Sequence, residues 1–399
     1  MKLIAFSAEH LRLQAPLPFG LRDASGRLLL SAGASITQAN QLHDLRSLPL
    51  FADEHEANEW RRQLGAAVGT MLRQNAPLKT IAELHPGETP DTASHEASLP
   101  EQWDSLVSLL DLALREARPA AGLLARLGQV QDRAVRLGQR QLDASLYHLI
   151  HTAAQSYQRY SSHHALLVML VCDQAAQLLG WTPVQVASLG SAALSMNVAM
   201  AALQDQLAAS DTPLTDAMRD QIRSHAARSA DALQAAGVHD ALWLEAVRLH
   251  HDRGDVRAPL AALSEGQRLA RLLRRTDIFT AKISRRRTRE PMSPVQAARE
   301  ACLGGDGVPD EVGGALLRAT GLYPPGSWVE LANGERGIVV ARGRRANLPW
   351  VASLVSPSGM ALGEPALRDT LEARFAVRCA VAAAQMKVRP DHARILALR

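Results

Sequence analysis

The chain has 399 residues, too many for one ordinary hydrophobic core, so two or three domains are expected. Hydrophobic residues make up 47% and charged residues 21%, which excludes global disorder, and the 4% aromatic content favours packed helices over a β-sandwich. The formal net charge is only +4, and Cys172, Cys302 and Cys379 lie far apart, as expected for reduced thiols in a cytoplasmic protein.

Residues 1–75 predict a small α/β module. Its short apolar runs alternate with turns, and a hairpin is expected around a turn at residues 23–26. Thr37 is the expected cap of the helix that follows. Residues 76–100 contain Pro, Thr, Ser, Glu and His without an apolar period, which indicates a linker. No signal peptide and no stretch of 18 apolar residues is found, so no membrane contact is expected.

Residues 101–322 predict a bundle of five to seven helices. Helix starts are expected at Thr182 and Ser293, which each precede a proline, and at Thr215. Glycines at positions 180 and 237 are expected stops. The fold class is therefore mainly α.

Residues 323–399 predict a small β-rich module with a basic, partly helical tail. Apolar and polar residues alternate on both sides of Asn333-Gly334, a dipeptide typical of a hairpin turn.

Histidines that recur along the helical segments are the strongest functional signal. His225, for example, shares a helix face with apolar residues and is expected to point inward. Singly, such a histidine is more typical of a hydrogen-bonded core residue, but an ordered set on facing helices can hold Fe, Mn or Zn. The candidate metal ligands are His163, His225, His250, His251 and Asp277.

The order and spacing of these residues resemble the HD-GYP family of cyclic-di-GMP phosphodiesterases, a branch of the HD metal-dependent phosphohydrolases, over residues 145–320. The resemblance implies an HD-type helical bundle. The family's first helix histidine falls on His163 and its next on His225. Its paired histidines fall on His250 and His251, and a later aspartate falls on Asp277.

The family's L-L-H-D-I-G-K signature is replaced at residues 194–200. Met196 stands at the histidine, Asn197 at the metal-bridging aspartate and Met200 at the lysine, and no Gly-Tyr-Pro loop follows His251. A neutral amide bridges two cations less well than a carboxylate, and a thioether is a soft ligand for these ions. We therefore expect no catalytic residues and an inactive site, in which both methionines also fit as apolar core fillers.

The first functional hypothesis is a degenerate HD-GYP-like signalling protein, without a cofactor, that binds a protein partner or binds cyclic-di-GMP without cleaving it. Nine Lys or Arg and a single acid lie between Arg268 and Arg289. Arginine forks match phosphate oxygens without a metal. The candidate phosphate contacts are Arg274, Arg275, Arg285, Arg286, Arg287 and Arg289.

Two further readings stay open. The alternative is a metal-dependent phosphodiesterase with residual or altered activity, using one weakly held Fe, Mn or Zn ion on the histidines. Nucleic-acid binding is the weaker reading, because Phe279 is the one aromatic residue in the basic stretch. An apolar helix face either supports a homodimer or packs on the bundle; its residues are Trp103, Leu106, Leu109, Leu110 and Leu114.

Overall fold

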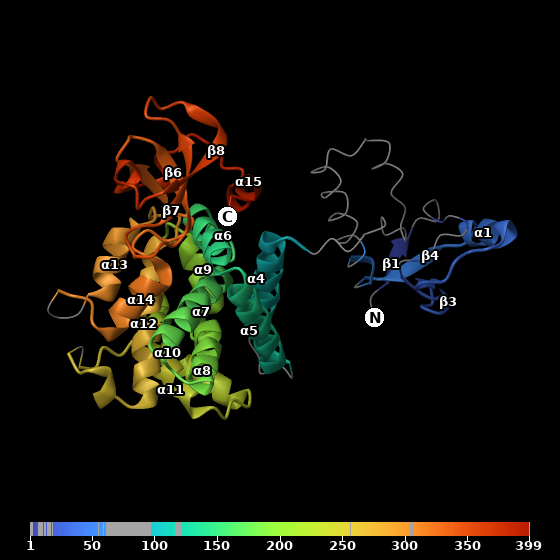
Figure 1. Ribbon diagram of the computed structural model, residues 1–399. Coiled ribbons are helices and arrows are strands. Elements are labelled where there is room, and N and C mark those ends of the chain that lie inside the picture. Colours follow the sequence, from blue (N-terminus) through green and yellow to red (C-terminus); the bar gives the residue numbers. More distant parts are fainter. Residues whose placement is uncertain are drawn as a thin grey trace. The chain divides into compact units, whose positions relative to one another are not determined.

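The computed structural model describes residues 3–60 with gaps at 7–10, 12, 14–16, 18, 55 and 59, and residues 97–398 except 116–121, 256 and 304–306. The chain divides into two compact units, Met1–Glu96 and Ala97–Arg399 (Figure 1). Most of the expected linker, residues 76–96, lies outside the described residues.

The first unit holds an antiparallel sheet of strand order β1-β4-β2-β3. The hairpin prediction is confirmed, because Gly26 adopts a φ of 87° between β2 and β3. The Thr37 cap was wrong: the residue before the helix is Gln38, whose side chain makes no capping hydrogen bond. The elements are β1 (Leu3–Phe6), β2 (Leu21–Arg22), β3 (Leu28–Leu30), α1 (Ala39–Arg46) and β4 (Leu50–Asp53).

The second unit begins with a helical domain, and the mainly α fold class is confirmed. Its described residues form eleven α-helices rather than five to seven, because the chain also turns at residues such as Gln141 that carry no turn signal. The helices are α4 (Leu99–Arg115), α5 (Leu123–Arg140), α6 (Leu142–Gln155), α7 (Tyr160–Leu178), α8 (Pro183–Ser195), α9 (Ala201–Ala209), α10 (Asp216–Ala235), α11 (Ala241–Leu249), α12 (Glu265–Ile283), α13 (Pro294–Cys302) and α14 (Glu311–Thr320), with 3-10 turns η2 (Val198–Met200) and η3 (Leu260–Ala262).

The predicted helix ends are confirmed by their hydrogen bonds and backbone angles. The side chains of Thr182, Thr215 and Ser293 each accept a hydrogen bond from a backbone N–H of the first turn. Gly180 and Gly237 end helices with φ of 72° and 96°.

Helix α7 is buried on nearly every side and forms the centre of the domain (Figure 1). Helices α4, α6, α8, α12 and α14 pack around it. The apolar face of α4 lies in this core: Trp103 and Leu110 are fully buried, and the Trp103 Nε1 donates to the Ser145 Oγ at 3.1 Å. This face therefore packs on the bundle, and the homodimer prediction loses the surface on which it rested.

One apolar stretch, Pro183–Ala209, is long and apolar enough to cross a membrane by length and composition. It comprises α8, η2 and α9, and 61% of its most apolar window is buried inside the domain. Core helices of globular domains pass the same test, so this is weak evidence for a span.

A five-stranded antiparallel sheet of order β8-β7-β6-β5-β9 covers one end of the helical domain (Figure 1). The predicted turn at Asn333-Gly334 is confirmed, with a Gly334 φ of 86° between β5 and β6. The elements are β5 (Trp328–Leu331), β6 (Arg336–Ala341), β7 (Trp350–Val355), β8 (Ala361–Asp369), η4 (Ala373–Phe375), β9 (Val377–Val381), η5 (Ala383–Gln385) and α15 (His392–Leu396).

Helix α6 joins this sheet to the helical domain. Tyr147 of α6 is buried in the core of the sheet module, and its hydroxyl lies 2.8 Å from the Nδ1 of His392 on α15. The Arg342 Nε donates to the Asp143 Oδ1 at 2.6 Å. The sheet and the bundle therefore share one compact unit.

Candidate functional site

Three histidines from two neighbouring helices converge in the helical domain. His225 lies on α10, and His250 and His251 follow the end of α11. The Nε2 of His225 lies 3.2 Å from the Nε2 of His250 and 3.2 Å from the Nε2 of His251. One nitrogen from each ring lies within 4.8 Å of the others, the closeness that a shared metal ion requires.

Backbone carbonyls fix the direction of two of these rings. The Nδ1 of His225 donates to the Ile222 carbonyl and that of His250 to the Val247 carbonyl, each at 2.6 Å. Because a carbonyl only accepts, the proton of each neutral ring sits on Nδ1 and the Nε2 presents a lone pair. The lone pairs therefore point into the shared space.

Burial favours the neutral form most strongly at His250, whereas His251 is exposed. Burial lowers the pKa of His250 to about 3, and it also lowers the pKa values of His225 and His251. Metal ligation requires neutral imidazole, and three imidazoles plus water are a workable tetrahedral arrangement. The three histidines therefore fit one divalent transition-metal ion.

Asp277 on α12 lies beside this cluster. Its Oδ1 is 2.7 Å from the Nε2 of His164, which is 2% exposed. Although burial raises the pKa of Asp277, the hydrogen bond from His164 is the largest of the opposing effects, which lower this pKa to about 2. Asp277 is thus an anion that already has a partner, His164.

His164, and not the expected His163, is the α7 histidine at this site. Successive residues on a helix point about 100° apart, so only one of the pair reaches Asp277. His163 lies near His148 and Asp104 instead, and burial and His148 lower its pKa to about 4 while Asp104 raises it. Sequence order alone could not choose between two adjacent histidines.

Met196, Asn197 and Met200, which the sequence resemblance aligned with the family signature, lie where α8 ends. Met196 is 1% exposed and belongs to the core of the domain, as expected for an apolar filler. The Oδ1 of Asn197 is buried without a hydrogen-bond partner among the described residues. Met200 ends η2, which packs against α10, the helix that carries His225.

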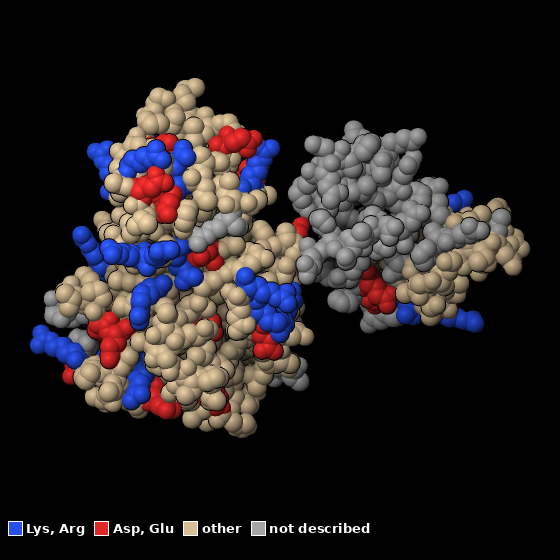
Figure 2. Space-filling view, in the orientation of Figure 1, with Lys and Arg blue, Asp and Glu red and all other residues tan. Residues whose placement is uncertain are grey.

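The six candidate phosphate arginines do not form one surface. Arg274 and Arg275 lie within α12, whereas the other four follow its end at Ile283. Lys and Arg form several patches on the visible face of the described residues, with Asp and Glu among them (Figure 2). The six candidate phosphate contacts are therefore divided between two parts of the domain.

Most of these guanidinium groups have partners inside the protein. Arg275 forms a two-pronged ion pair with Asp310, which also caps α14. Arg286 donates to the Tyr160 hydroxyl at 3.2 Å. The remaining contacts are Arg285 to Glu290 at 3.1 Å, Arg287 to Asp211 at 3.5 Å and Arg289 to the Ala281 carbonyl at 2.5 Å. Among the described residues Arg274 has no such partner.

No protein-family profile matches the chain, and no curated protein sequence matches it. A solved structure that does match is Bd1817, a HDG"Y"P protein from Bdellovibrio bacteriovorus. It is 14% identical, with a TM-score of 0.43, and the match covers 79% of this chain and 98% of that one. A similarity this low does not by itself assign a family or an activity.

Proposed function

We propose that the helical domain is a degenerate domain of the HD-GYP type, which signals by binding and does not open the ring of cyclic-di-GMP. One observation carries the proposal. The described site offers three neutral histidine nitrogens that converge on one point, while the position of the bridging aspartate holds an uncharged asparagine and its neighbour Met196 is packed into the core.

The physical reason for this proposal is the repulsion between two metal cations that no anionic ligand separates. Two divalent cations about 3.5–4 Å apart repel each other strongly unless an anionic ligand lies between them. Asn197 carries no charge, and Asp277 already accepts a hydrogen bond from His164. The site is therefore suited to one ion at most, and a two-metal mechanism lacks its central ligand.

Metal content and hydrolysis of cyclic-di-GMP by the full-length chain test this proposal together. We expect at most one Fe, Mn or Zn per chain and no linear dinucleotide product. The double variant Met196→His with Asn197→Asp is expected to hold more metal than the natural chain. Two tightly held ions in the natural chain, together with product at an enzymatic rate, would refute the proposal.

The second candidate is a single-metal phosphohydrolase, favoured by the carbonyl-anchored Nδ1 atoms of His225 and His250. One bound ion can lower the pKa of its water and supply a hydroxide nucleophile. This candidate requires that Zn or Mn raise the melting temperature, since an ion that binds the native state must stabilise it. Phosphodiester cleavage that His250→Ala abolishes would favour it over the first proposal.

The proposal that the domain signals by binding has two forms, one with a nucleotide as the ligand and one with a protein. Calorimetry with cyclic-di-GMP separates nucleotide binding from protein binding. Because five of the six expected arginines are held by other groups of the protein, we expect little or no heat with the cyclic dinucleotide. Binding in the micromolar range would contradict this expectation and make the nucleotide the signal. A folded protein that gives no heat leaves a protein partner.

A further inference from the structure

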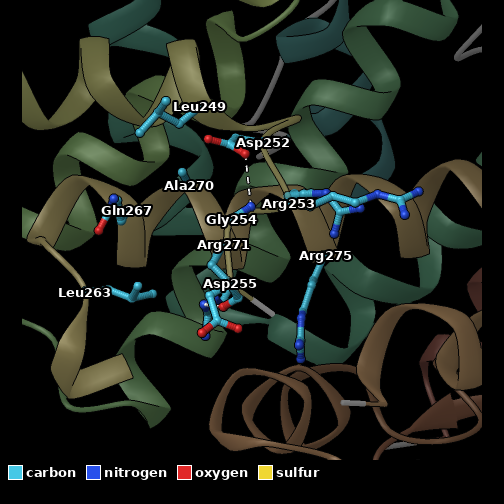
Figure 3. Close-up of a pocket in the computed structure, with 11 residues that line it drawn as sticks. Leu249, Asp252, Arg253, Gly254, Asp255, Leu263, Gln267, Ala270, Arg271 and Arg275 are labelled. Atoms are coloured by element: carbon cyan, nitrogen blue, oxygen red, sulfur yellow. Dashed lines mark hydrogen bonds between the residues drawn. The ribbon is translucent and has the colours of Figure 1, made fainter. Parts of the chain in front are cut away.

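A small basic pocket lies between α12 and the loop that follows His251 (Figure 3). Its volume is about 90 Å³. Four arginines and two aspartates contribute to its lining, together with apolar and amide side chains. The charged residues are Arg253, Arg271, Arg274, Arg275, Asp252 and Asp255.

Two of the four arginines build the walls. Arg271 donates to the Asp255 carbonyl at 2.6 Å and to the Ala258 carbonyl at 2.5 Å, which holds the loop against α12. Arg275 points away from the loop (Figure 3), and it is paired with Asp310. Neither guanidinium depends on a ligand for its position.

The two aspartates are also engaged within the loop. The Asp252 Oδ1 accepts the Gly254 N–H at 2.9 Å, a bond drawn in Figure 3. The Asp255 Oδ1 accepts the Arg257 N–H at 2.9 Å. These bonds turn both carboxylates toward the backbone that follows them.

Arg253 and Arg274 remain without a hydrogen bond or an ion pair among the described residues. Arg253 is exposed on the loop, whereas Arg274 is half-buried on α12. Burial lowers the pKa of Arg274 and the positive charges of Arg253 and Arg275 lower it further, although the negative charges of Asp277 and Asp252 raise it. A partly desolvated guanidinium beside other cations is stabilised by an anion, and arginine forks fit phosphate oxygens.

We propose that this pocket binds a terminal phosphate group, either free phosphate or the monoester end of a nucleotide, between Arg253 and Arg274. Arg275 is paired with Asp310, and the other three arginines of the lining outnumber its two aspartates, so the pocket keeps a net charge of +1 that favours an anionic end group. The volume is well below the roughly 300–1,000 Å³ of pockets that enclose a whole small molecule. One end group therefore fits, whereas a cyclic diester bears substituents on both sides of each phosphate. The proposal does not depend on the HD-GYP assignment.

Titration of the full-length chain with inorganic phosphate and with 5′-GMP, followed by calorimetry, tests the proposal. We expect saturable binding of one equivalent of each, competition between the two, and no displacement by cyclic-di-GMP. Arg253→Gln and Arg274→Gln should each weaken binding about tenfold to a hundredfold. Arg257→Gln is the matched control: the same loop carries this exposed arginine, which does not line the pocket.

Three results would overturn the proposal. The first is no heat with either probe at millimolar concentration, and the second is equal weakening by Arg257→Gln and Arg253→Gln. The third is displacement of 5′-GMP by cyclic-di-GMP, which would make the pocket a diester site. Because Arg253 is exposed, its replacement should leave the melting temperature unchanged, and this variant keeps the test valid if Arg274→Gln misfolds. Hydrolysis and metal content are measured separately, so each proposal can fail by itself.

Discussion

Gly326, just before β5, lies close to the backbone of α6, and Gly326→Ala should weaken this contact. A Cβ at this position would lie 2.7 Å from the Tyr147 carbonyl oxygen and 2.9 Å from the His151 backbone nitrogen. Both atoms belong to the backbone of α6 and cannot rotate aside. The φ of 88° adds strain, because residues with a Cβ rarely adopt it.

Gly359→Ala separates the clash from the strain. Gly359 has a similar φ of 85°, but no atom lies within 4 Å of its would-be Cβ. The strain of about 1–3 kcal/mol and the stiffening of the unfolded chain are thus common to both variants. Overpacking against backbone should cost Gly326→Ala about 1–3 kcal/mol more.

Urea unfolding at equilibrium measures the difference in the free energy of unfolding between the two variants. A larger loss for Gly326→Ala is expected, with altered fluorescence from the neighbouring Trp328 if the sheet shifts. Equal losses in the two variants would refute the close docking of the sheet on α6 and, with it, the single compact unit from Ala97 to Arg399.

Three further predictions concern the stability of the same unit. Burial lowers the folded-state pKa of His151 to about 4. The contribution of this histidine to the free energy of unfolding is therefore full above about pH 6.5 and is lost as the pH falls toward 4. His151→Gln should reduce this pH dependence, whose slope is up to about 1.4 kcal/mol per pH unit, as measured by urea titrations. Trp103→Ala should cost about 3–5 kcal/mol in chemical unfolding, whereas Leu112→Ala, at a 50% exposed position, should change stability little. Arg275→Gln removes the charged partner of Asp310, which is itself 32% exposed, and should cost about 1–3 kcal/mol in the same assay, so a variant as stable as the natural chain would contradict the structural role of this pair.

Much of the architecture follows from local sequence. Helix starts at Thr182, Thr215 and Ser293 are readable because side-chain caps act within three residues of the helix end. The turn at Asn333-Gly334 is readable for the same reason, since the positive φ it needs is a property of one residue. The turn at Gln141 has no such signal, and the number of helices was therefore underpredicted.

Both the sequence and the tertiary structure were needed to define the candidate site. The sequence by itself determined that three histidines and an aspartate are available as ligands and that residue 197 is an uncharged asparagine, because chemical identity does not change on folding. Only the tertiary structure decided that His164 rather than His163 meets Asp277, and that most of the basic stretch is held by internal partners. Those outcomes depend on how each helix is rotated and packed. The rotation and packing are set by contacts between side chains that lie far apart in the sequence.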